Sequence, residues 1–241
     1  MKKDRIYRNR QDALSDFAFD ENVAGVFSDM IHRSLPGYDL VISMIKVISG
    51  YYREKNRNYY DLGCSLGAST ISMGYGLDSE KCKIIAVDNS QAMISRCNKN
   101  IADANLKTPV ELICADLQDV NIENAKIVVM NFTLQFIEPE KREIILKKIS
   151  KGLVNGGVLI LSEKITFGTD ADKILNETLY VEFKKANGYS DLEISQKRTA
   201  LEKVLVPETI RQHLQRLDKC GFSDSKVWYR CLNFSSIIAF K

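Results

Sequence analysis

The sequence is poor in histidine and in net charge, and it contains no long apolar run. Two histidines occur in 241 residues, and 34 basic against 31 acidic residues leave a formal charge of +3. Nucleic-acid-binding proteins usually show a concentrated basic face, which this balance does not indicate. The N-terminus lacks the apolar segment of a signal peptide, and no stretch of about 18 apolar residues occurs. We therefore expect a cytoplasmic protein without membrane contact or direct nucleic-acid binding.

Paired cysteines are also missing. The six cysteines are spread singly along the chain, with no C-x-x-C pair and no histidine at metal-ligand spacing. Zinc and iron–sulfur centres require such clusters, so we expect no metal. Isolated thiols in apolar patterns are typical of reduced cysteines in a cytosolic protein.

What the sequence does contain is a regular alternation of strand and helix patterns. The predicted strands are 59–62, 83–87, 110–113, 125–130 and 157–162, followed by 226–231 and 236–240 with a turn at 232–235. The predicted helices are 22–34, 38–54, 67–76, 90–104 with Ser90 as N-cap, 139–152, and two or three within 170–219. This order predicts an α/β fold: a seven-stranded, mostly parallel sheet with an antiparallel C-terminal hairpin and helices on both faces.

The length fits one domain over residues 1–241, with two additions to the alternating core. Residues 1–20 are polar and aromatic without a clear period, so residues 1–35 are expected to form an N-terminal arm or lid followed by a helix. Residues 168–206 carry helix formers and no strand pattern, which predicts a helical insertion.

The glycine-rich turn after the first strand permits two interpretations. Asp61 ends the strand, and Gly63-x-Ser65-x-Gly67 leads into a helix. Glycines let a ligand approach the backbone closely, and the helix N-terminus offers free N–H groups. The same letters match the G-x-S-x-G nucleophile elbow of the α/β-hydrolases.

The hydrolase interpretation needs an acid and then a histidine after the serine, with the histidine in a loop. His32 precedes Ser65, and His213 lies in a segment with helical period, where we expect it on the helix surface. No HGGG-type segment offers an oxyanion hole. The cofactor-loop interpretation is therefore favoured.

The second strand strengthens the nucleotide interpretation. It ends at Asp88, followed by Asn89, and a carboxylate at this strand tip binds ribose hydroxyls in Rossmann-type sites. Asp88 could instead cap the next helix, but Ser90 can serve that role. Ser65 stands where the G-x-G-x-x-G motif needs its second glycine, which disfavours NAD.

Polar residues also follow the third and fourth strands. Asp116-Leu117 could contact an adenine amine, although a solvated loop acid is equally compatible with the pattern, and Asn131 ends an apolar run. Because parallel strands meet at one edge of a sheet, these residues converge on the same crevice.

The chain resembles class I S-adenosylmethionine-dependent methyltransferases at Asp61–Gly67, Val87–Ser90 and Asn155–Leu159. Beyond those motifs it is similar, nearly end to end, to the carboxy-S-adenosyl-L-methionine synthase family. The distinctive segments are Phe19–Ala24, Phe27–Tyr38, Asn131–Phe136, Leu161–Lys164 and Lys185–Arg198. The resemblance implies the Rossmann-like class I methyltransferase fold.

The resemblance also implies an activity. Members of the family convert S-adenosyl-L-methionine and prephenate to carboxy-S-adenosyl-L-methionine, phenylpyruvate and water. A partner tRNA carboxymethyltransferase, CmoB, uses the product to modify the wobble uridine of tRNA. The family is dimeric, so the insertion at 168–206 is expected to make the dimer contact. The implied contacts to S-adenosyl-L-methionine or its carboxylated form are Tyr38, Gly63, Cys64, Ser65, Asp88, Asn89, Asp116, Leu117, Asn131 and Arg198.

Arg198 is the residue to which the resemblance gives a role in the reaction. It is expected to reach the neighbouring subunit's site, where a guanidinium can bind the new carboxylate bidentately. The residues alone favour an ion pair between Arg198 and Glu202, four positions on. No residue is a convincing general base, and hydroxide lost from prephenate could remove the methyl proton.

Two alternatives remain at this stage. An ordinary methyltransferase acting on a small molecule or an RNA base would share the same cofactor motifs. Asn131 is followed by Phe132-Thr133 without prolines, which disfavours amino-group methylation. A non-catalytic cofactor-binding module is the other alternative, and the polar residues at several loop ends argue against it.

Overall fold

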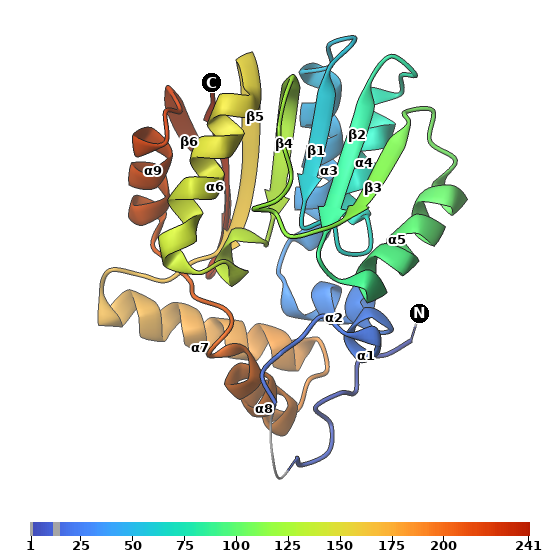
Figure 1. Cartoon of the computed structure of the whole chain (residues 1–241). Coiled ribbons are helices and arrows are strands. Elements are labelled where there is room, and N and C mark those ends of the chain that lie inside the picture. Colours follow the sequence, from blue (N-terminus) through green and yellow to red (C-terminus); the bar gives the residue numbers. More distant parts are fainter. Residues whose placement is uncertain (1, 12–14) are drawn as a thin grey trace.

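A seven-stranded sheet forms the centre of the computed structural model, which describes residues 2–11 and 15–241 (Figure 1). Its strands are β1 (Asn58–Leu62), β2 (Lys83–Asp88), β3 (Val110–Cys114), β4 (Ala125–Asn131), β5 (Leu153–Lys164), β6 (Asp224–Cys231) and β7 (Phe234–Phe240). They lie in the order β3-β2-β1-β4-β5-β7-β6. The first five pair in parallel, and β7 runs antiparallel to both β5 and β6. The predicted sheet and its C-terminal hairpin are confirmed.

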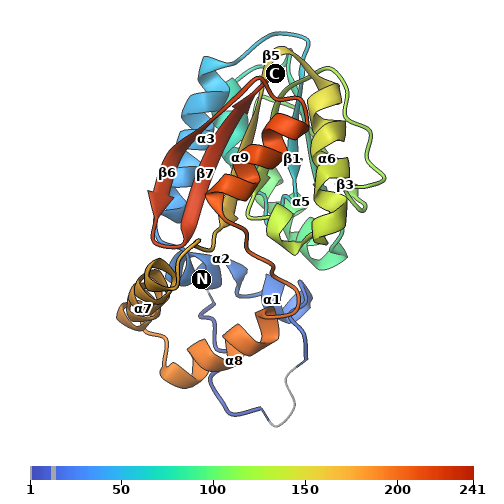
Figure 2. The ribbon, with the colours of Figure 1, turned by 90° about the vertical axis from the view of Figure 1, so that its left-hand side faces the viewer.

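Helices cover both faces of the sheet, as predicted (Figures 1 and 2). Alternate strand residues point to opposite faces, which builds two cores. Ile84 and Val129 belong to the core under α3 (Tyr38–Tyr51) and α4 (Ala68–Leu77), with α5 (Gln91–Ala104) beside it. Val128 and Met130 belong to the core under α6 (Pro139–Gly152), which α9 (Ile210–Lys219) extends.

The remaining helices gather beyond the carboxyl ends of the parallel strands (Figures 1 and 2). They are α1 (Glu21–Ala24), α2 (Phe27–Ser34), α7 (Asp170–Ala186) and α8 (Asp191–Leu201). We call these four helices, with the N-terminal arm, the cap. An apolar cluster that includes Phe17, Met30 and Ala200 joins the arm, α2 and α8. The cap thus combines the two segments that the sequence set apart from the alternating core.

The N-terminal arm is tied to α8 by hydrogen bonds. The Gln196 amide donates to the carbonyl oxygens of Tyr7 and Asn9, both at 2.9 Å, and accepts from the Gln11 N–H at 2.8 Å. The Tyr189 hydroxyl donates to the buried carboxylate of Asp4 at 2.7 Å. The arm was predicted over residues 1–20, of which 1 and 12–14 lie outside the described residues.

Several predicted boundaries were wrong. The helix expected at 22–34 is two helices, because the chain turns at Gly25-Val26, and α3 ends at Tyr51 rather than at 54. Strand β5 begins at Leu153, before the expected Gly157, and η1 (Leu134–Phe136) adds a single 3₁₀ turn. The hairpin turn consists of Leu232 and Asn233 alone, because Cys231 already pairs with Phe234.

Candidate active site

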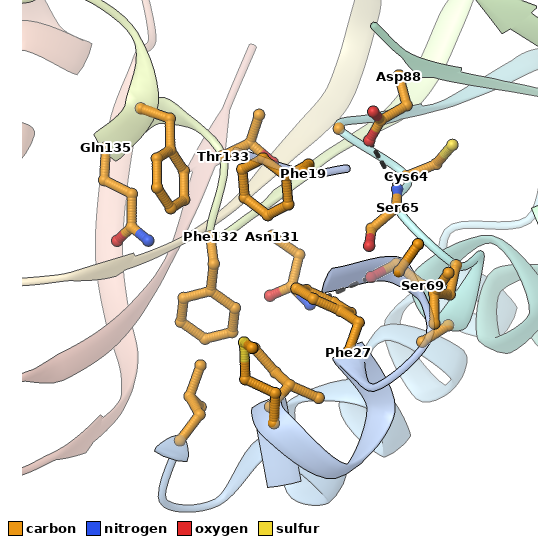
Figure 3. Close-up of a pocket in the computed structure, with 18 of the residues that line it drawn as sticks. Phe19, Phe27, Cys64, Ser65, Ser69, Asp88, Asn131, Phe132, Thr133 and Gln135 are labelled. Carbon is orange, nitrogen blue, oxygen red and sulfur yellow. Dashed lines mark hydrogen bonds between the residues drawn. The ribbon is translucent and has the colours of Figure 1, made fainter. Parts of the chain in front are cut away.

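A cavity of about 960 Å³ opens between the carboxyl ends of the strands and the cap. Loops after β1, β2, β3 and β4 form one side of it, and α1, α2, α7 and α8 contribute to the other. Figure 3 shows part of this lining, including Phe27 of α2 and Asn131 at the end of β4. Nine of the ten predicted contact residues line this cavity: Tyr38, Gly63, Cys64, Ser65, Asp88, Asn89, Asp116, Leu117 and Asn131. The structure thus brings these nine residues together in one cavity.

The loop from Gly63 to Gly67 has the backbone conformation that its glycines suggested. Gly63 has φ +84° and Gly67 φ +87°, in the region that disfavours side chains. A Cβ added at Gly63 would stand 2.2 Å from the Thr133 hydroxyl oxygen. The N–H groups of Gly63 and Cys64 both donate to the Val87 carbonyl, at 2.8 and 2.9 Å. The loop is thus fixed between the ends of β2 and β4.

Asp88 holds this loop with its carboxylate. Its Oδ2 atom accepts from the Ser65 N–H and its Oδ1 atom from the Ser90 N–H, both at 2.9 Å (Figure 3). Burial raises the pKa of Asp88, and the two N–H donors oppose that rise. Each oxygen keeps a second lone pair for a ligand hydroxyl. Ser90 caps α5 through the Met93 N–H, as predicted.

Ser65 is not arranged as a nucleophile. Its φ of +50° is strained, as in a nucleophile elbow, but its hydroxyl lies 3.5 Å from the sulfur of Met93. His32 lines the cavity, yet its ring nitrogens are bonded to the Ser28 carbonyl at 2.6 Å and to Asp39 at 2.9 Å. Neither histidine is hydrogen-bonded to Ser65 within the described chain, so no serine–histidine pair exists there.

The prediction for His213 was wrong. The residue lies in α9 as expected, but its side chain is only 2% exposed, because it shares the buried face of the helix with Leu217. Burial lowers the pKa of His213 to about 4; the negative charge of Glu208 opposes this shift, and the positive charge of Arg216 adds to it. Neither ring nitrogen has a hydrogen-bond partner among the described residues.

Two buried oxygen atoms beside the glycine loop lack hydrogen-bond donors in the described chain. Thr70 donates to Oδ2 of Asp61 at 2.5 Å, which leaves Oδ1 without a partner. Asn131 donates to the Ser69 hydroxyl at 3.1 Å, and its own Oδ1 also has no partner (Figure 3). Burial raises the pKa of Asp61 to about 7. Asn131 lines the cavity, so its free oxygen can accept a hydrogen bond from a ligand, whereas Asp61 is fully buried.

The turn after β4 is held by a buried acid that the sequence analysis did not single out. Glu163 accepts from the N–H groups of Leu134 and Gln135, at 2.9 and 2.8 Å, and burial raises its pKa to about 8. Beside this turn the rings of Phe19 and Phe136 meet edge to face, with centroids 5.2 Å apart. Both rings line the cavity and supply an apolar wall suited to a flat ring.

The residues after β2 and β3 lie at the exposed rim. Asn89 and Asp116 are both exposed, and one oxygen of Asp116 accepts from the Gln118 N–H at 2.8 Å. The second oxygen of Asp116 is thus available to a ligand amine. Leu117, next to it, is partly buried against the core and lines the cavity.

Arg198 is the one predicted contact that does not line the cavity of its own chain. It is exposed on α8, and the ion pair with Glu202 is not formed within the described residues. Burial chiefly lowers the pKa values of Lys164 and Lys184, and the positive charge of Arg198 lowers them further.

None of the helices in residues 2–11 and 15–241 combines the length and the hydropathy that a membrane span requires. In the same residues no group of three or more histidine, cysteine or acidic side chains is arranged to hold a metal ion, and the six cysteines are free thiols.

The sequence is similar to known proteins over nearly its whole length. Residues 60–157 match the model of a methyltransferase domain family. The chain is 50% identical over 239 residues to the carboxy-S-adenosyl-L-methionine synthase of Shewanella sediminis, covering 99% of this chain and 98% of that protein. It is 52% identical over 241 residues to the synthase of Geobacter sp., covering 100% and 99%. The chain belongs to the carboxy-S-adenosyl-L-methionine synthase family.

Solved structures share the fold at lower identity. Human N-acetylserotonin methyltransferase aligns with a TM-score of 0.61 at 15% identity, covering 92% of this chain and 55% of that one. A Methanococcus maripaludis protein, assigned by its name to the S-adenosyl-L-methionine-dependent methyltransferases, aligns with a TM-score of 0.60 at 20% identity, covering 96% and 97%. These likenesses confirm the class I methyltransferase fold.

Proposed function

We propose that this protein makes carboxy-S-adenosyl-L-methionine from S-adenosyl-L-methionine and prephenate, releasing phenylpyruvate and water. The proposal rests on a sequence identity of 50% and 52%, over nearly the full length, to two carboxy-S-adenosyl-L-methionine synthases. The site is consistent with it, because nine of the implied contact residues line one cavity. S-Adenosyl-L-methionine is a substrate here, and the free oxygen of Asn131 in the cavity can accept a hydrogen bond from it.

The reaction balances without an added oxidant or reductant. The ring carboxylate of prephenate leaves as carbon dioxide, and the freed electron pair aromatises the ring and expels its hydroxyl as hydroxide. Hydroxide takes a proton from the sulfonium methyl group and becomes water. The methyl carbon then forms a bond to carbon dioxide, which gives the new carboxylate. The protein's task is to hold both substrates together and exclude competing water.

Arg198 is proposed to bind the new carboxylate in the neighbouring subunit of a homodimer. Its exposure on α8 leaves it accessible to a second chain. Helix α7 offers a dimer contact within the 168–206 insertion, because three large apolar side chains there are exposed: Ile174 at 65%, Leu175 at 56% and Leu179 at 46%. The insertion and residues 1–35 are thus proposed as additions to one domain spanning residues 1–241.

The product is proposed to serve the partner enzyme CmoB in the cytoplasm, which carboxymethylates the wobble uridine of tRNA. No direct contact of this protein with nucleic acid is proposed, in keeping with the formal charge of +3.

Mass spectrometry of the purified protein incubated with both substrates tests the activity. The expected product has the mass of S-adenosyl-L-methionine plus a carboxylate, in equal amount to phenylpyruvate. Unchanged or demethylated S-adenosyl-L-methionine would instead support an ordinary methyltransferase. Arg198→Ala is expected to retain S-adenosyl-L-methionine binding and to weaken binding of the carboxylated form, and equal loss of both would contradict the role of Arg198.

A further inference from the structure

Two lysine side chains lie over the ring of Tyr180 at the edge of the cavity. Lys164 is the last residue of β5 and lines the cavity together with Tyr180 from α7. The Lys164 ammonium lies 5.5 Å from the centre of the tyrosine ring, and the Lys184 ammonium lies 4.3 Å from it. Arg198 is near enough to act on both lysines. None of the ten contact residues implied by the resemblance belongs to this lysine pair.

These lysines differ from their neighbours in having no carboxylate partner among the described residues. Lys185, the next residue on α7, pairs with Glu182 at 3.3 Å and with Asp191 at 2.9 Å. Lys164 and Lys184 make no such ion pair in residues 2–11 and 15–241, although Lys184 is only 8% exposed. Buried charges normally form ion pairs, so two neighbouring lysines without an acidic partner indicate that an anionic ligand binds here.

The electrostatics of the lysines agree with this arrangement. Burial, then the charges of Lys164, Lys197 and Arg198, lower the pKa of Lys184 to about 7. Burial also lowers the pKa of Lys164, against the opposing charge of Glu177. The cluster therefore carries a cost in charge repulsion that a bound anion would relieve.

We propose that Lys164 binds a carboxylate of the second substrate, and that Lys184 supports it as a positioning residue through its charge. The proposal rests on the proposed function, in which that substrate, prephenate, is a dicarboxylate. The carboxylate bound here is the one on the side chain that is retained in phenylpyruvate. A cation bound to the ring carboxylate would stabilise its negative charge and so oppose its loss as neutral carbon dioxide, so we place the ring toward the sulfonium instead.

Steady-state kinetics with varied prephenate, and calorimetric binding of S-adenosyl-L-methionine, test the subsite. Lys164→Met is expected to raise the KM for prephenate by about tenfold to a hundredfold, the range for a lost hydrogen bond to a charged group. Its affinity for S-adenosyl-L-methionine should stay within about twofold of the wild type. Lys185→Met is the matched control, because that lysine is exposed and already paired. An unchanged KM in Lys164→Met would overturn the proposal.

The pH dependence of the KM for prephenate tests whether Lys184 acts through its charge, because a purely structural role would not produce it. In the wild type the KM for prephenate should rise as the pH passes upward through about 7, where Lys184 loses its proton. Lys184→Met should remove that inflection without lowering the melting temperature, because it removes an unpaired buried cation. Lys184→Arg, which stays charged, should keep a low KM to higher pH. An inflection that persists in Lys184→Met would overturn the role of this residue.

Two further measurements keep this test separate from the proposed function. If Lys164→Met does not fold, Lys164→Gln and Lys164→Arg replace it, and only the arginine variant should retain a low KM. If the wild type forms no carboxylated product, the proposed function fails, and calorimetric titration with prephenate alone still tests the subsite. Equal prephenate affinity of the wild type and Lys164→Gln would then contradict the subsite itself.

Discussion

Asp88 accepts a hydrogen bond of 2.9 Å from the backbone N–H of Ser65, so the tip of β2 holds the loop that follows β1. The second oxygen of Asp88 accepts from Ser90 in the same way. A single carboxylate thus shapes the cofactor loop, begins the turn into α5 and faces the cavity. Loss of its charge is therefore expected to affect both loop geometry and ligand binding.

Asp88→Asn is expected to weaken S-adenosyl-L-methionine binding by about tenfold to a hundredfold. Both oxygens of Asp88 accept from N–H groups, so the amide NH₂ of asparagine must face a donor on one side. Isothermal titration calorimetry measures the change. Asp78→Asn is the control, because Asp78 is exposed and ends α4 with φ +40°, which asparagine tolerates. Binding by Asp88→Asn within twofold of the wild type would contradict this prediction.

Gly63→Ala is expected to lower the free energy of unfolding by about 2–4 kcal/mol. An alanine is strained in the left-handed backbone conformation of this position, and its Cβ would also clash with a neighbour. The new Cβ would lie 2.2 Å from the Thr133 hydroxyl and 2.9 Å from the Thr133 Cβ. Urea denaturation measures the loss. Gly168→Ala should be nearly neutral, since no atom lies within 4 Å of a Cβ there. Thr133→Gly in the Gly63→Ala background should restore part of the stability, and no recovery would show that the clash is not the cause.

Arg142→Met is expected to lower the free energy of unfolding by about 3–5 kcal/mol. The fully buried guanidinium pairs with Glu208 and donates to the carbonyl oxygens of Gln135, Ile137 and Val206, at 3.2, 2.8 and 2.9 Å. Truncation leaves those acceptors without a donor in the interior.

The matched control for Arg142 lies on the same helix. Lys147 is exposed and pairs only with Glu143, so Lys147→Met should change stability by no more than about 0.5 kcal/mol. Arg142→Lys should recover little, because one ammonium cannot donate to acceptors that lie in three directions. Full stability of Arg142→Lys in urea denaturation would show that charge alone matters at this position.

His213→Phe is expected to make the protein less sensitive to acid. The pKa of His213 is lowered to about 4 in the folded chain, against about 6.5 when unfolded. Above pH 6.5 the histidine is neutral in both states and costs no stability. As the pH falls toward 4, the unfolded chain binds the proton first, and the free energy of unfolding falls by up to about 3 kcal/mol. The difference in unfolding free energy between variant and wild type, measured from pH 7 to pH 4, should favour the variant increasingly. A difference that does not vary with pH would contradict the lowered pKa.

Local signals predicted much of the fold correctly. The bounds 139–152 were right for α6, and Ser90 caps α5 as expected, because both depend on residues near in sequence. The strand-end residues Asp88 and Asn131 could be placed in one site because parallel strands share a carboxyl edge. The alternation of strands and helices predicts parallel strands, and parallel strands place their carboxyl ends at the same edge of the sheet.

Tertiary packing decided what the sequence could not. His213 is an exception, because Ile210, Leu214 and Leu217 give α9 an apolar face at helical spacing and His213 lies on that face, so its burial could have been predicted. Lys164 and Lys184 read as ordinary surface lysines, because their common neighbour Tyr180 gathers them only in the folded chain. Glu163 carries no sequence sign of its bonds to the Leu134–Phe136 turn.

The hydrogen bonds between the arm and α8 have a consequence for biosynthesis. Residues 4–11 leave the ribosome early, whereas Tyr189 and Gln196, which they bind, are synthesised long afterwards. The loop at Gly63 and its partner Asp88 can therefore assemble on the nascent sheet while the cavity still has no cover. During translation the arm must wait without its partner, and the enclosure of the substrates is the last part of the site to be completed.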